Sequence, residues 1–171
     1  MCEGNIINAF DSAINELLSE KYVSYLLNAQ ERAISGRLAI HLADALDDYD
    51  KGYFVDIEYN RNAYLRKILC SQCKDFNDCN NGKCKHWVAP DIIFHQRGSD
   101  NNYIFCEIKK SDDNIVDKRK VVAAINGLNY KYGIVINKFT KDKVELLLLT
   151  KNNTDGVFYS FDFNKKQLVN R

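Results

Sequence analysis

PDIIFHQRGSDNNYIFCEIKK, residues 90–110, is the stretch that decides the fold of this chain. Two apolar-rich runs flank the polar loop 97–102, and this arrangement predicts a β-hairpin. Because strand residues project alternately to opposite faces, Glu107 and Lys109 point to the same side of the second strand. Pairing of the two runs brings Asp91 close to them. Two carboxylates that converge beside an amine are typical of a site for a hard divalent cation.

Length and composition favour one globular domain. A chain of 171 residues buries about 70% of its unfolded surface and needs no disulfides to hold its core. The hydrophobic fraction of 46% and the charged fraction of 27% are ordinary for a soluble protein. With 24 basic and 23 acidic residues, the net charge of +1 gives no global support for nucleic-acid binding, so any such binding depends on a local patch. We expect one domain over residues 1–171.

The apolar segments predict a cytoplasmic protein without a membrane anchor. The first five residues lack the basic start and apolar run of a signal peptide. No apolar run reaches the ~20 residues of a membrane span. We therefore expect no membrane partner.

The N-terminal part of the chain predicts two helices, one over residues 5–19 and a longer one over residues 20–46, because apolar residues recur there at helical spacing. Glu31 lies within the apolar stripe of the second helix. A carboxylate in a buried stripe is costly unless it is paired or binds a metal, so Glu31 is a candidate functional residue. The alternative is a salt bridge to Arg32 or Arg37, or an edge position that reaches water.

Other polar side chains in this half of the chain have plainer interpretations. A lone histidine on an apolar helix face is usually a satisfied core residue, so His41 is predicted to be structural. Residues 53–59 alternate as a strand, and Asp56 and Glu58 on one face predict a solvated surface. The alternative is that Glu58 borders the same charged pocket as Asp91.

Residues 60–87 interrupt the regular pattern and are interpreted as an insertion. They carry four of the six cysteines, with the spacing C-x2-C-x5-C-x4-C and a tight turn at 80–82. A tetrahedral zinc site needs two thiolate pairs presented by such turns, so structural Zn²⁺ is the first choice. An iron–sulfur cluster takes the same four thiolates, and disulfides or free thiols are the third alternative. The proposed ligands are Cys70, Cys73, Cys79 and Cys84.

The C-terminal half predicts a helix followed by three strands. Ser111 is a suitable N-cap, and Gly127 is a suitable stop. The apolar runs 132–136 and 143–149 predict buried strands. Residues 156–161 predict a last strand at the edge of the sheet.

The predicted elements follow the order helix, strand, strand, strand, helix, strand. Asp91 opens the second strand, and residues 107–109 close the third. This arrangement resembles the PD-(D/E)XK nuclease superfamily. The match extends from about Glu31 to Ile136. Residues 31–32, 58–61 and 90–95 look like an uncharacterised bacterial branch of these nucleases, and the four-cysteine insertion departs from the shorter loop of that branch. The resemblance implies an α/β fold with a restriction-endonuclease-like core, in which helices flank a mixed central sheet of four to six strands.

The same resemblance implies a nuclease that uses Mg²⁺ or Mn²⁺ to hydrolyse phosphodiester bonds of DNA, and we expect an endonuclease. Asp91, Glu107 and the backbone carbonyl of Ile108 would bind the ion. Lys109 would orient or deprotonate the attacking water and stabilise the transition state. Glu31 would hold a water on the ion or a second ion.

Several alternatives stay open. Lys110, Lys118, Arg119 and Lys120 are candidates for contacts to the nucleic-acid backbone. A non-catalytic nucleic-acid-binding or protein-interaction module could keep the same fold, although Asp91, Glu107 and Lys109 are all present. In a third interpretation, Glu107 and Lys109 form only a surface ion pair on an edge strand. The sequence does not separate DNA from RNA or one strand from two, and it leaves the oligomeric state open, a homodimer included.

Overall fold

The computed structural model describes residues 1–47, 49, 51–62, 65–66, 68–69, 86–111 and 115–171. Its helices are α1 (Glu3–Ser19), α2 (Val23–Asn28), α3 (Glu31–Leu46) and α4 (Ile115–Gly127). Its strands are β1 (Phe54–Ile57), β2 (Arg61–Asn62), β3 (Leu65–Arg66), β4 (Ile68–Leu69), β5 (His86–Trp87), β6 (Ile92–His95), β7 (Asn102–Ile108), β8 (Tyr130–Asn137), β9 (Glu145–Thr150), β10 (Asn153–Asp162) and β11 (Gln167–Asn170). No helix in this described part of the chain is long and apolar enough to cross a bilayer.

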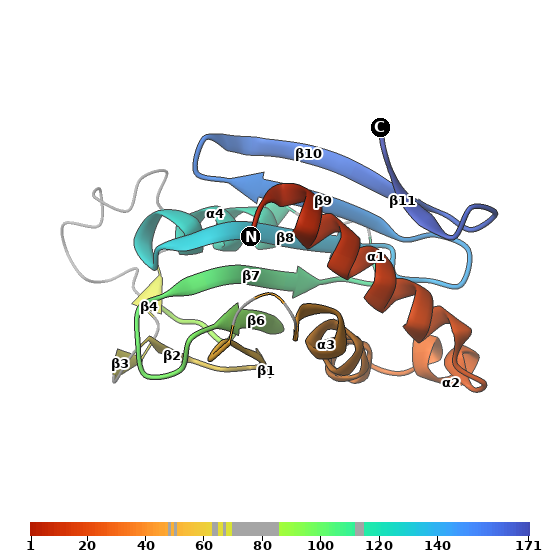
Figure 1. Cartoon of the computed structure of the whole chain (residues 1–171), viewed down its shortest axis with the longest axis horizontal. Helices are drawn as coiled ribbons and strands as arrows, with labels where there is room; N and C mark the ends of the chain where they lie inside the picture. The colour runs from red at the N-terminus through yellow and green to blue at the C-terminus, as the bar shows by residue number, and fades with distance from the viewer. Residues whose placement is uncertain (48, 50, 63–64, 67, 70–85, 112–114) are drawn as a thin grey trace.

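The fold is mixed α/β, built on one seven-stranded sheet with the order β1-β6-β7-β8-β9-β10-β11 (Figure 1). Neighbouring strands are antiparallel except β7 and β8, which are parallel. A parallel pair needs a crossover connection, and α4 supplies it. Two small sheets, β2-β3 and β4-β5, stand apart from this one. The sequence prediction of four to six strands was therefore too low for the central sheet.

The predicted hairpin is present. β6 pairs antiparallel with β7, with Ile92 opposite Cys106 and Phe94 opposite Ile104. β7 is buried along its whole length, because it lies in the interior of the sheet with a strand on each side. The hairpin therefore joins an interior strand of the sheet to the strand that Asp91 precedes.

Helices cover both faces of the sheet and create two separate cores. α1 and α3 cover one face, where Ile104, Cys106 and Ile108 of β7 pack. α4 covers the other face, where Phe105 packs. The predicted alternation along β7 is therefore confirmed. It places Glu107, which follows Phe105 by two residues, on the α4 side.

α4 packs unusually close to the sheet at one point. A Cβ atom on Gly133 of β8 would lie 2.1 Å from Cγ1 of Val121 and 2.9 Å from Cδ1 of Ile125, both on α4. These distances are too short for any side chain. Glycine at this position therefore lets the helix backbone approach the strand directly.

The single helix predicted over residues 20–46 is wrong, because the chain forms two helices with a break at Ala29 and Gln30. Both residues are extended, with ψ of −175° and 153°. The sequence has neither glycine nor proline here to signal a break. A distant contact stabilises it instead, since Lys110 Nζ donates a hydrogen bond of 2.9 Å to the carbonyl of Ala29.

The strand predicted at the edge of the sheet is not at the edge. β10 pairs with β9 on one side and with β11 on the other, so β11 forms that edge. The hairpin between β10 and β11 turns at Asp162, whose Oδ1 accepts hydrogen bonds from the amides of Asn164 and Lys165 at 2.9 and 3.1 Å. β11 is only four residues long with two apolar side chains, which is too weak a pattern to predict a strand.

Candidate functional site

The candidate site lies where β7 ends, β6 begins and α3 begins. Asp91 directly precedes β6, and its Oδ2 accepts a hydrogen bond of 2.8 Å from the amide of Ile108. Register between the two strands therefore places Asp91 beside the segment that carries Glu107 and Lys109. This is the proximity that the hairpin was predicted to create.

Glu31 contacts the same segment from α3. It is the first residue of the helix, and its carboxylate accepts hydrogen bonds of 3.1 Å from Lys109 Nζ and from the amide of Lys110. The alternative partners suggested by sequence are engaged elsewhere, Arg32 with Glu58 and Arg37 with Glu20. Glu31 is thus brought to Lys109 by tertiary structure.

These contacts explain the charge state of Glu31 and Lys109. Burial alone would raise the pKa of Glu31, but hydrogen bonds from the Lys110 amide and Lys109 lower it below its usual value. Burial likewise opposes the charged form of Lys109, yet the hydrogen bond to Glu31 raises the lysine pKa. Both side chains are therefore charged at neutral pH.

Glu107 is the most deeply buried carboxylate of the site. The residue is 3% exposed, and its Oε1 lies 2.7 Å from Lys120 Nζ but outside hydrogen-bond geometry. Burial raises the pKa of Glu107 to about 8, with the nearby Asp91 adding to the shift and Lys120 opposing it. The interpretation of Glu107 and Lys109 as a surface pair on an edge strand is therefore wrong.

The pKa of Asp91 is also raised, as for Glu107. Burial raises its pKa, and the negative charge of Glu31 adds to this effect. The Ile108 amide, Lys120 and Lys109 act in the opposite direction. Carboxylates in this site therefore raise one another's pKa, which a bound cation would relieve.

Asp117 on α4 belongs to the cluster, although the sequence did not predict it. It is 8% exposed, and burial raises its pKa. Its charge interacts with those of Lys109, Lys120, Asp91 and Glu31. A sequence signal did exist, because Asp117 and Lys120 are three residues apart and so lie on one side of a helix.

Glu58 lies beside the site rather than within it. Its amide donates a hydrogen bond of 3.0 Å to the carbonyl of Pro90, the residue before Asp91. Its carboxylate pairs with Arg32, the neighbour of Glu31. Glu58 has a positive φ of 49°, which turns the chain sharply at the end of β1.

The four predicted backbone-binding residues have different surroundings. Lys120 is held between Glu107 and the carbonyl of Ala89, to which its Nζ donates at 3.3 Å. Lys118 Nζ donates at 3.1 Å to the carbonyl of Asp155. Arg119 is exposed, and Lys110 ties the end of β7 to the break between α2 and α3. Lys120 thus belongs to the buried charge cluster.

The remaining polar candidates have structural contacts. His41 Nε2 lies 2.6 Å from a carboxylate oxygen of Glu20. The predicted solvated face is wrong for Asp56, which lies 2.9 Å from Nε2 of the buried His95 and accepts hydrogen bonds from Arg97. The hydrogen bond from Arg97 is the main cause of the lowered pKa of Asp56.

The cysteine motif falls outside the described residues, since Cys70, Cys73, Cys79 and Cys84 all lie between residues 70 and 85. Of the described cysteines, Cys2 is exposed and Cys106 is buried, and both are free thiols. The zinc assignment therefore stays a prediction.

Within the described residues, the fit to a divalent cation depends on Asp91 and Glu107. No three side chains of histidine, cysteine, aspartate or glutamate within the described part of the chain are grouped to hold a metal ion. The donor chemistry of Asp91 and Glu107 nevertheless fits Mg²⁺ or Mn²⁺, because both offer oxygen and Glu107 Oε1 is buried without a hydrogen bond. Two carboxylates and the Ile108 carbonyl would form the protein share of such a site.

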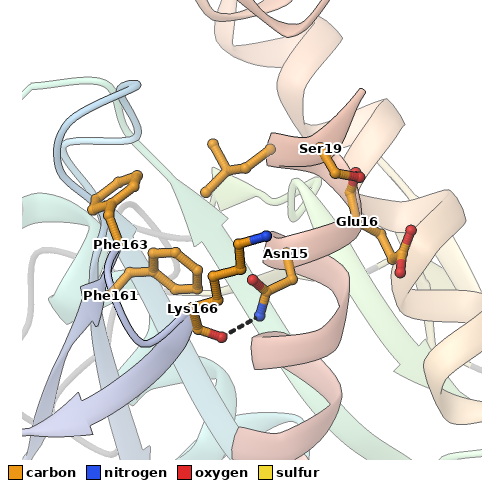
Figure 2. Close-up of a pocket in the computed structure, with 7 residues that line it drawn as sticks. Asn15, Glu16, Ser19, Phe161, Phe163 and Lys166 are labelled. Carbon is orange, nitrogen blue, oxygen red and sulfur yellow. Dashed lines mark hydrogen bonds between the residues drawn. The ribbon is translucent and has the colours of Figure 1, made fainter. Parts of the chain in front are cut away.

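A separate groove lies between α1 and the β10–β11 hairpin (Figure 2). Phe161 and Phe163 line one side, and Asn15, Glu16 and Ser19 of α1 line the other. Asn15 Nδ2 donates a hydrogen bond of 2.6 Å to the carbonyl of Lys166, which fastens the hairpin to the helix. None of the candidate residues named above lines this groove.

Comparison of the chain with protein-family models, with curated proteins and with solved structures finds no match.

Proposed function

We propose that this protein is a metal-dependent nuclease that hydrolyses phosphodiester bonds of DNA, and that it acts as an endonuclease. One observation supports this function best. The end of β7, the start of β6 and the start of α3 bring Glu31, Asp91 and Lys109 together beside the buried Glu107. Carboxylates with raised pKa values next to lysines are the arrangement expected around a cation and a phosphate.

Asp91 and Glu107 would hold the ion, together with the Ile108 carbonyl. When bound, Mg²⁺ or Mn²⁺ would neutralise phosphate charge and lower the pKa of a water molecule. Burial of Glu107 keeps the site in a low dielectric, where charge interactions are stronger than in water. Lys120 Nζ lies 2.7 Å from Glu107 Oε1 and would balance the charge of this carboxyl group once it ionises.

Lys109 would act on the phosphate and the attacking water. Its pKa is raised through the hydrogen bond to Glu31, so Nζ carries a proton at neutral pH and can donate hydrogen bonds. We infer that Lys109 orients the water and stabilises the charge that develops on phosphate oxygens. Glu31 fixes the position of Nζ through their 3.1 Å contact.

The direct test is DNA cleavage by the purified full chain in Mg²⁺ or Mn²⁺, with supercoiled plasmid and with labelled single- and double-stranded DNA and RNA. Lys109→Ala should lower the cleavage rate by at least about 100-fold, since it removes a donor to the transition state. The fold should persist, because Lys109 is 32% exposed and its ion pair contributes about 1 kcal/mol at most.

Lys143→Ala is the matched control. Lys143 also pairs with a glutamate, Glu145, at 3.1 Å, but this ion pair includes none of Glu31, Asp91, Glu107 and Lys109. Its variant should cleave at the wild-type rate. Equal activity of wild type and Lys109→Ala on every substrate would contradict the nuclease assignment.

A non-catalytic nucleic-acid-binding module is the second candidate. The observation in its favour is that Glu107 already has a cationic partner, since Lys120 Nζ lies 2.7 Å from its Oε1, as expected in a site that holds no metal. Calorimetric titration with Mn²⁺ separates the two functions. The nuclease requires binding that Asp91→Asn abolishes, whereas the binding module predicts no such heat.

We also propose that the four clustered cysteines bind structural Zn²⁺, on the strength of their spacing. Metal analysis of the purified protein should find about one zinc per chain. A brown protein with visible absorption would instead identify an iron–sulfur cluster.

A further inference from the structure

Two exposed tyrosines lie next to each other at the start of α2. Tyr22, at the N-terminus of the helix, is 63% exposed, and Tyr25 is 77% exposed. Their ring centroids are 6.3 Å apart, and the rings meet edge to face at 62°. Single exposed aromatics are common on protein surfaces, but here two exposed rings contact each other at the start of a short helix.

The charge beside these rings is positive. Lys21 Nζ lies 5.2 Å from the centroid of the Tyr22 ring, in a cation–π contact. The nearby carboxylate of Glu20 is already neutralised by Arg37 and lies 2.6 Å from His41. Exposed aromatic faces next to an ammonium group suit a ligand that combines flat bases with phosphate.

The tyrosine pair is linked directly to the candidate site. α2 ends one residue before Ala29, whose carbonyl accepts the hydrogen bond from Lys110 Nζ. The amide of Lys110 donates in turn to Glu31, at 3.1 Å. Tyr25 precedes Ala29 by four residues, or about 6 Å along a helix. Figure 1 shows α2 at the end of the molecule toward which the arrow of β7 points.

We propose that Tyr22 and Tyr25, with Lys21, form a stacking surface for unpaired bases of the nucleic-acid strand that enters the candidate site. This inference deepens the proposed function, on which it rests, by naming the substrate class as single-stranded or frayed nucleic acid. Bases inside a duplex are stacked on one another and do not offer their faces, whereas unpaired bases do.

The test measures binding without cleavage, by fluorescence anisotropy of a labelled 12-nucleotide oligo(dT) with the full chain in EDTA. Replacing both tyrosines by alanine should weaken binding by at least about tenfold, because each lost stack removes a base contact. Replacing both by phenylalanine should keep the affinity within about twofold. A blunt 12-base-pair duplex should be affected less than the single strand.

Tyr49→Ala is the matched control, since Tyr49 is also exposed, at 39%, but follows the opposite end of α3. It should bind oligo(dT) as wild type does. Unchanged binding in the double alanine variant would overturn the inference, and so would a wild-type dimer in sedimentation that this variant abolishes, because a second copy would then cover the tyrosines. Tyrosine-dependent binding without metal-dependent cleavage would instead sustain the stacking surface and refute the nuclease.

Discussion

Two carboxylates of the central sheet face cations, yet the protein holds them in opposite ways. Asp56 on β1 accepts a hydrogen bond of 2.8 Å from Arg97 Nε and lies 2.9 Å from His95 Nε2. The hydrogen bond from Arg97 is the main reason that the pKa of Asp56 is lowered. Glu107 on β7 meets Lys120 outside hydrogen-bond geometry, and burial raises its pKa to about 8.

The difference separates a structural carboxylate from a candidate functional one. The hydrogen bonds from its partners favour the ionised form of Asp56, so this charged carboxylate stabilises the fold. For Glu107, burial disfavours the ionised form more than Lys120 favours it, so ionisation of this group destabilises the fold. Strongly perturbed pKa values cluster at functional sites, and this is why Glu107, rather than Asp56, is proposed as a site residue.

The largest expected effect is a loss of stability of the wild type with rising pH in EDTA. A carboxyl group whose pKa is raised in the folded state stabilises the fold below its unfolded pKa of about 4.5, and this contribution is lost as pH rises through about 8. The free energy of unfolding should fall by up to about 5 kcal/mol across this window. Urea unfolding at pH 5 and pH 8.5 measures it.

Glu107→Gln should remove most of this pH dependence. Glu145→Gln is the control, because hydrogen bonds from Lys143 and Lys138 outweigh burial and lower the pKa of Glu145. Glu145 therefore contributes stability above its unfolded pKa, with the opposite sign. If the free energy of unfolding depends on pH in the same way in Glu107→Gln and wild type, the distinction between Glu107 and Asp56 is wrong.

The next effect is stabilisation by metal. An ion that binds Asp91 and Glu107 in the folded state alone should raise the free energy of unfolding by about 2.7 kcal/mol at 100 times its dissociation constant. Urea unfolding at pH 8 with and without Mg²⁺ measures this gain. Asp91→Asn should lose the gain and Glu145→Gln should keep it, whereas an equal gain in both would place the ion elsewhere.

The smallest expected effect belongs to Asp56. Asp56→Asn should lower the free energy of unfolding at pH 7 by about 2 kcal/mol, because it weakens charge-assisted hydrogen bonds with Arg97 and His95. Its effect should shrink as pH falls below about 3.8, where the native carboxyl group also loses its charge. Cleavage activity should not change, and a large loss of activity would assign Asp56 to the site.

Local sequence patterns predicted the parts of the fold that neighbouring residues determine. Alternation along residues 103–108 and the polar loop before them predicted the hairpin, and the structure confirms both. The same period of two placed Glu107 on one face of the strand. Such patterns depend on strand geometry alone, so a single sequence reveals them.

Features that depend on distant contacts could not be predicted in this way. The break at Ala29 is stabilised by Lys110, which is 81 residues away in sequence. Asp117 and Lys120 join the site because α4 packs over β7, which no helical pattern specifies. The hydrogen bond that holds Asp56 likewise comes from Arg97, which is 41 residues away in sequence.

Gly133 determines how closely α4 approaches the sheet beside the candidate site. Val121 and Ile125 occupy the space that a side chain at position 133 would fill. The absence of that side chain therefore sets the distance between α4 and β8. A single added methyl group would act as a wedge and lift Asp117 and Lys120 away from Glu107 together. The distance of these charges from Glu107 therefore depends on position 133, a residue that has no side chain and no charge.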